Sequence, residues 1–141
     1  MKIFMLLIML FSHIVDDYYL QGPLTDMKQQ SWWKKKCKQQ GLLLYQTIYW
    51  RDYKVALIEH AFSWTFMVML TPMMLMIFSK DVHLAWFLVL FGINWIIHGI
   101  VDDLKANKKV LNLVVDQFIH VVQVTVTWAI MLYGIIPDIY K

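Results

Sequence analysis

Four apolar segments constrain the fold of this chain more than any other feature of its sequence. They cover residues 3–21, 53–78, 82–104 and 110–133 approximately. Each is near or above the roughly 20 residues that a helix needs to cross a bilayer. Only 16% of the 141 residues are charged, against about a quarter in an average soluble domain. The sequence therefore predicts one all-α membrane domain, a bundle of four transmembrane helices.

The first segment follows Lys2 and has the apolar character of a signal peptide. However, no small-x-small cleavage site follows it, and its helical pattern of polar residues continues as far as Asp17. Gly22 and Pro23 then provide a strong stop signal for a helix. We therefore expect a retained span that ends just before these two residues.

Basic residues are concentrated in two of the connections between the apolar segments. Seven of the 13 Lys and Arg residues lie between positions 28 and 54, and three more lie between 105 and 109. Since connections rich in Lys and Arg stay in the cytoplasm, both basic loops are expected there and both termini outside. The first loop, residues 24–51, interleaves Lys with Trp32 and Trp33. This composition favours an interfacial loop on anionic membrane lipids rather than a partner of nucleic acid.

Histidine and aspartate recur at helical spacing inside the apolar segments. Residues four apart share one face of a helix, and three of the four segments contain such a His/Asp pair. At about 1.5 Å per residue, the three pairs and a single His in the second segment all reach the cytoplasmic half of the bilayer. The seven residues expected to meet in this layer are His13, Asp17, His60, His98, Asp102, Asp116 and His120.

Such a polar layer inside a membrane needs a compensating interaction. A carboxylate at the bilayer centre costs about 2.5–3.5 kcal/mol. His nitrogens and Asp oxygens form a ligand set that suits Zn²⁺, Mn²⁺ or Fe²⁺. We therefore predict that the seven residues are candidate metal ligands and that zinc is the foremost metal. Because seven ligands exceed the need of one tetrahedral ion, either two ions bind or some of the seven support the ligands or carry protons. Asp17, Asp102 and Asp116 are also the candidate catalytic carboxylates, and a hydrogen-bonded polar core without metal is the alternative.

Further polar residues are expected to support the ligands by hydrogen bonding or to join the helices. They are Gln21, Asn94, Lys105, Asn112 and Gln117. The neighbouring carboxylates Asp16 and Asp103 lie about 100° around their helices from the predicted ligands. We interpret these two as charges at the membrane interface.

The same residues form four motifs in a fixed order. They are H-x-x-x-D-x-x-L-Q from His13 to Gln21, the single His60, H-x-x-x-D-x-x-K from His98 to Lys105, and D-Q-x-x-H from Asp116 to His120. This order resembles a family of small bacterial and phage integral membrane proteins that is classed only as domain of unknown function 3307. The resemblance covers most of the chain and implies a four-helix fold in the bacterial inner membrane, without an established activity.

The chain departs from the family pattern at several positions. Asp16 replaces a small residue, Tyr18 replaces Phe, and Trp64 stands where a further His can occur. The segment from Lys34 to Trp50 is also longer than usual. A looser resemblance connects the chain to membrane-bound metal-dependent hydrolases, which by itself does not decide the function.

The sequence leads to one preferred function and three alternatives. The preferred function is a metal-dependent hydrolase that acts on a lipid, phosphoester or peptide bond at the cytoplasmic leaflet, with nearby Lys residues binding an anionic headgroup. The first alternative is a metal- or proton-linked transporter or channel, since intramembrane Asp and His also build ion pathways. A haem-binding bundle is the second. The third is a non-catalytic structural protein that binds a membrane partner or forms a homo-oligomer.

Overall fold

The computed structural model describes residues 2–41, 49–79 and 84–132, and the regular elements in these ranges are all helical. The all-α prediction is thus confirmed for the described residues. The elements are α1 (Lys2–Val15), the π-helical turn η1 (Asp16–Leu20), α2 (Leu24–Met27), α3 (Gln30–Gln39), α4 (Asp52–Ser79), α5 (Leu84–Ala106) and α6 (Leu113–Ile130).

Four of these helical stretches are long and apolar enough to cross a membrane. They are α1 with η1, α4, α5 and α6, and they match the four predicted spans. The fourth helix starts at Leu113 rather than at residue 110, because Asn112 has an extended backbone and caps it by accepting a hydrogen bond from Val115 N at 2.9 Å. Residues 82, 83 and 133 of the predicted spans lie outside the described residues.

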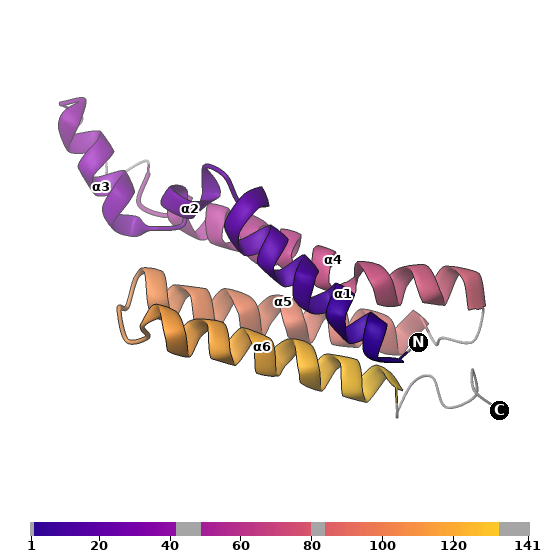
Figure 1. Cartoon of the computed structure of the whole chain (residues 1–141). Coiled ribbons are helices and arrows are strands. Elements are labelled where there is room, and N and C mark those ends of the chain that lie inside the picture. The colour runs from indigo at the N-terminus through magenta and orange to yellow at the C-terminus, as the bar shows by residue number, and fades with distance from the viewer. Residues whose placement is uncertain (1, 42–48, 80–83, 133–141) are drawn as a thin grey trace.

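The four long helices form one bundle. In this bundle α4 packs along both α5 and α1, and α6 packs along α5 and α1. The connection between α5 and α6 lies at the same end of the bundle as α2 and α3, opposite the N-terminus (Figure 1). Both of the predicted basic connections are therefore at one end of the molecule.

The predicted basic loop contains the short helices α2 and α3 and is fastened to the α5–α6 connection. The Asn107 side chain accepts a hydrogen bond from Gln30 N at 2.8 Å and donates one to Lys28 O at 3.1 Å. Trp33 Nε1 also donates to Met27 O at 2.7 Å. Residues 42–48 of the loop prediction lie outside the described residues.

Apolar and polar residues occupy different halves of the bundle interior. The half next to the N-terminus is filled by apolar side chains, among them Met5, Met9, Val68, Phe87 and Met131. Large apolar side chains also cover the outer surface, as Phe4 and Phe118 do. An apolar exterior of this kind is expected of helices that face lipid. The buried charged residues lie in the other half, toward the basic end.

Candidate metal centre

The first long helix ends in a π-helical turn that buries two consecutive aspartates. In η1 the Gln21 N–H donates to the Asp16 carbonyl oxygen at 3.1 Å, an i to i+5 hydrogen bond. A π-helical turn is wider than an α-helical one, so each residue advances by a smaller angle. Asp16 and Asp17 are both buried as a result, with exposed fractions of 0% and 7%. The prediction that Asp16 is an interfacial charge is wrong, because it assumed α-helical spacing.

The structure brings all seven predicted ligands into one buried cluster. They come from every long helix: His13 from α1, Asp17 from η1, His60 from α4, His98 and Asp102 from α5, and Asp116 and His120 from α6. Among the described residues, two overlapping groups of three have ligand atoms close enough together to hold a metal ion. The groups are Asp17, His60 and His98, and His98, Asp102 and His120.

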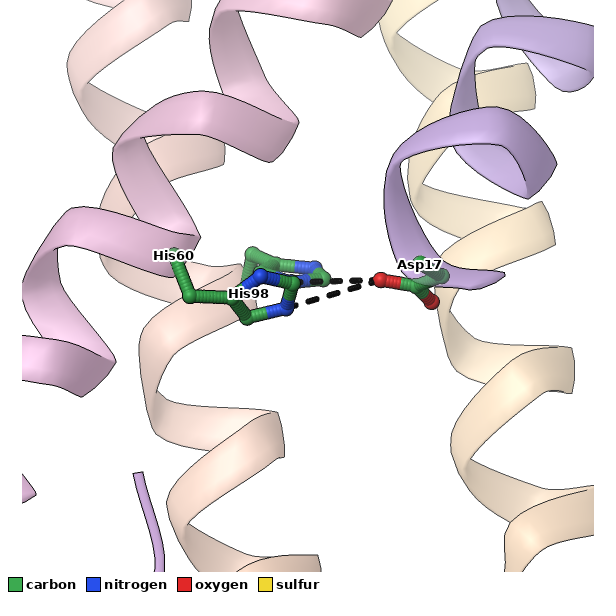
Figure 2. Close-up of side chains that lie close together, drawn as sticks. All are labelled: Asp17, His60 and His98. Atoms are coloured by element: carbon green, nitrogen blue, oxygen red, sulfur yellow. Dashed lines mark hydrogen bonds and ion pairs between the residues drawn. The ribbon is translucent and has the colours of Figure 1, made fainter. Parts of the chain in front are cut away.

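In the first group an aspartate faces two imidazoles. Asp17 Oδ1 lies 3.5 Å from His60 Nε2 and 3.9 Å from His98 Nε2, and the two Nε2 atoms are 3.2 Å apart. Figure 2 shows both rings directing a nitrogen toward the Asp17 carboxylate. Ligands held at 2.0–2.1 Å around a tetrahedral zinc ion lie about 3.3 Å from one another. The separations of 3.2 and 3.5 Å are close to this requirement, and the Asp17–His98 separation of 3.9 Å is longer.

The second group adjoins the first through Asp102 and His98. Asp102 Oδ1 lies 3.4 Å from His120 Nε2, whereas Asp102 Oδ2 lies 3.2 Å from His60 Nε2 in the first group. The His98 ring likewise directs Nε2 toward His60 and Nδ1 toward His120 Nδ1, at 3.2 Å in each case. Asp102 therefore directs one oxygen to each group, whereas His98 contacts His120 Nδ1 on the side opposite the His120 nitrogen that faces Asp102.

Two predicted ligands lie beside these groups rather than within them. Asp116 Oδ1 is 3.5 Å from His120 Nε2, but Asp116 Oδ2 accepts a hydrogen bond from Lys105. His13 Nδ1 accepts a hydrogen bond from Trp64 Nε1 at 2.8 Å. Because this bond uses the nitrogen lone pair that would bind an ion, the structure makes His13 Nδ1 a hydrogen-bond acceptor rather than a ligand.

Trp64 has a larger part in the cluster than the sequence indicated. Its side chain is completely buried, and its indole stacks on the His98 ring with a centroid distance of 4.1 Å and an interplanar angle of 13°. The same indole N–H fixes the ring of His13. Trp64 follows His60 by four residues, so both lie on one face of α4. This spacing could have predicted from the sequence that Trp64 belongs to the cluster.

Lys28 is a second residue that sequence reasoning missed. It was assigned to the membrane surface, but its Nζ donates to Asp102 Oδ2 at 2.5 Å. Lys105 donates to Asp116 Oδ2 at the same distance. The Lys28–Asp102 pair joins residues that are 74 positions apart, so no local pattern reveals it. These two ammonium groups partly compensate the charge of the buried carboxylates.

Several buried ligand atoms have no hydrogen-bond partner among the described residues. They include Asp17 Oδ1, Asp116 Oδ1 and His120 Nε2. More than nine-tenths of buried polar groups in proteins are paired, so such atoms in one cluster need an explanation. A divalent cation bound among them would supply the missing interactions.

Of the predicted supporting residues, Gln117 contacts the cluster directly. Its side-chain amide donates to Asp17 Oδ2 and to Asp116 Oδ2, both at 3.1 Å, and so joins η1 to α6. Gln21 lines the cavity described below. By contrast, Asn112 is exposed and caps α6, so the prediction that it supports the ligands is wrong.

Asn94 joins two helices away from the ligands. Its side-chain oxygen accepts hydrogen bonds from Gln123 Nε2 at 2.9 Å and from Thr127 Oγ1 at 3.0 Å. Its amide donates to Leu90 O within α5. This buried network connects α5 to α6 and explains why these polar residues lie inside the bundle.

A cavity of about 280 Å³ reaches the cluster at the basic end of the bundle. Its lining includes the two carboxylates Asp17 and Asp102 together with the amines of Lys28 and Lys105. A small molecule in this cavity is therefore in contact with both candidate ligand groups and with two cations.

Comparison of the chain with protein-family models, with curated proteins and with solved structures finds no match. The resemblance to the family of unknown function stays a prediction.

Asp16→Asn is expected to weaken metal binding by about 10–100-fold without removing a ligand. Asp16 Oδ2 lies 3.8 Å from His60 Nδ1 and its other oxygen accepts a hydrogen bond from Ser63 at 2.7 Å. At 3.8 Å these two atoms are not hydrogen-bonded, but the negative charge of Asp16 favours a proton on the nearer ring nitrogen, Nδ1, and so leaves Nε2 available to an ion. Metal titration of the purified variant measures the loss, with Ser63→Ala expected to have a smaller effect. An affinity equal to that of the wild type contradicts this role.

Proposed function

We propose that this protein is a membrane-embedded, metal-dependent hydrolase of the bacterial inner membrane. The observation on which the proposal rests is the cavity lined by Asp17, Asp102, Lys28 and Lys105. It combines candidate metal ligands with cations that attract an anionic substrate. We place the basic end of the bundle in the cytoplasm and both termini outside, because ten of the 13 basic residues belong to the two basic connections.

The buried His/Asp groups supply the parts that metal-assisted hydrolysis requires. A divalent ion bound there, zinc foremost, would supply a water with a pKa near 7 and a Lewis acid for the scissile bond. If His98, Asp102 and His120 held such an ion, the carboxylate of Asp17, which lines the same cavity, would accept the proton of the attacking water. Lys28 and Lys105 are placed to bind a phosphate group of a lipid or other phosphoester.

The test combines metal content with turnover. We expect the detergent-purified protein to retain a divalent metal and to hydrolyse an anionic phospholipid or a phosphoester substrate. A chelator should abolish turnover and added metal should restore it, while Lys28→Gln should raise KM. A protein that retains metal but cleaves no lipid, phosphoester or peptide substrate contradicts the hydrolase and leaves a metal-binding membrane protein.

One observation favours a proton-linked transporter as the second candidate. The rings of His60, His98 and His120 form a continuous series of contacts between nitrogens, each of 3.2 Å, through which a proton can pass. The apolar half of the bundle, with Met9 and Val68 fully buried, closes this series toward the N-terminal side. Proton or metal flux into proteoliposomes that is lost in Asp102→Ala would establish this candidate in place of the hydrolase.

A further inference from the structure

A second and larger cavity, of about 580 Å³, lies between α4 and α5 and shares no lining residue with the first. Its walls are mainly apolar and include Leu57, Ile58, Ile96 and Ile100. Three of these side chains also face outward, because Ile58, Ile96 and Ile100 are each more than half exposed. The cavity is therefore a groove on the outer surface of two helices that are apolar enough to cross a membrane.

Small residues and one Trp give the groove its depth. Gly99 faces Ala61, where an added Cβ would lie 3.5 Å from the Ala61 Cβ, so α4 and α5 approach each other closely at this point. Trp95 Nε1 donates to Ile58 O at 3.1 Å and bridges the two helices farther from the basic end. From Lys54 to Ala61 the groove extends roughly 10 Å along α4.

The end of the groove near the basic connections is positively charged. Lys54 and Lys108 line it there, and neither ammonium group has a hydrogen-bond or ion-pair partner among the described residues. Asp103 also lines the groove and offsets one of the two charges, so a net positive charge remains; its carboxylate accepts a hydrogen bond from Asn107 at 2.8 Å. Lys28 and Lys105 differ from this pair, since both are already bound to carboxylates of the His/Asp cluster.

We propose that the groove binds one anionic phospholipid, with its phosphate on Lys54 and Lys108 and an acyl chain along Leu57, Ile96 and Ile100. An apolar groove with two unpaired lysines at the level of the headgroups is complementary to such a lipid in both polarity and charge. A second copy of this chain docked by two-fold symmetry would instead bring a second pair of lysines to the same place. The proposal rests on the membrane placement given above but not on the metal centre or the hydrolase.

The test uses the full chain in phosphatidylcholine vesicles that contain phosphatidylglycerol with a photoreactive acyl chain. We expect illumination to label α4 and α5 at the groove, and excess unlabelled phosphatidylglycerol to prevent labelling. The double variant Lys54→Gln, Lys108→Gln should bind the probe roughly 30-fold more weakly, since each Lys near the headgroups contributes about fivefold. The control Lys34→Gln, Lys35→Gln removes the same charge from the exposed face of α3, outside the groove, and should leave labelling of α4 and α5 at the groove as in the wild type, whatever it does to labelling of α3 itself.

Three results would overturn the proposal. They are equal labelling of the Lys54/Lys108 double variant and the wild type, equal labelling by a photoreactive phosphatidylcholine, and crosslinks at the groove to a second copy of the chain in place of lipid. Metal content measured on the same samples separates this site from the His/Asp cluster. It should be unchanged in the double variant, and loss of labelling with metal retained supports a lipid site that is independent of the cluster.

Discussion

Asp102→Asn is expected to abolish tight binding of divalent metal and to remove any effect of a chelator on thermal stability. Asp102 directs one carboxylate oxygen to His60 and the other to His120, so its charge acts on both candidate groups. The loss of affinity should exceed the roughly 10–100-fold that removal of a supporting partner costs. Metal bound at 100 times its dissociation constant stabilises a fold by about 2.7 kcal/mol, a difference that thermal unfolding with and without chelator detects.

A metal-free polar core predicts the opposite result for this variant. In that case removing a buried charge should be nearly neutral or should stabilise the protein, and a chelator should not affect the wild type. A wild type that is insensitive to chelator therefore excludes the metal centre. Asp26→Asn is the matched control, since Asp26 is exposed on α2 and the chemical change is identical.

Asp116→Asn is expected to lower the metal affinity by a smaller factor than Asp102→Asn does. Asp116 lies at the edge of the cluster, with one oxygen 3.5 Å from His120 Nε2 and the other bound to Lys105. The sequence alone gave no reason to rank the two aspartates, because both form the same His/Asp pair.

Trp64→Ala is expected to destabilise the protein by about 3–5 kcal/mol, the usual cost of removing a fully buried aromatic side chain. Trp64 is completely buried, stacks on His98 and donates a hydrogen bond to His13. Its loss leaves a cavity between the ligands and the apolar core and also frees two of the imidazoles. Unfolding by denaturant in detergent measures the change in free energy.

Trp64→Phe distinguishes the contribution of the aromatic ring from that of the indole N–H group. Phe keeps an aromatic face against His98 but leaves His13 Nδ1 without its donor, which should cost about 1–3 kcal/mol. A Phe variant as unstable as the Ala variant would show that packing against His98 is not the main contribution. A fully stable Ala variant would contradict the assigned position of Trp64 in the bundle.

The four apolar helices and the residues that meet between them can be predicted from the sequence. The lengths of the apolar segments give the number of candidate spans. A spacing of four residues puts His98 and Asp102 on one face of a helix, and Asp116 and His120 on one face of the next. Because the helices alternate in direction, residues at matching depths had to reach one layer. The rise and turn per residue of an α-helix are sufficient to predict this layer.

The tertiary structure alone decided which partners these residues have. The π-helical turn changed the direction of Asp16, and α-helical spacing could not predict this. Lys28 and Trp64 entered the cluster through contacts with Asp102 and His13, residues distant in the chain, and such contacts depend on how the helices pack. Periodicity fixes the face on which a side chain lies, whereas the rotation and separation of neighbouring helices fix what it touches.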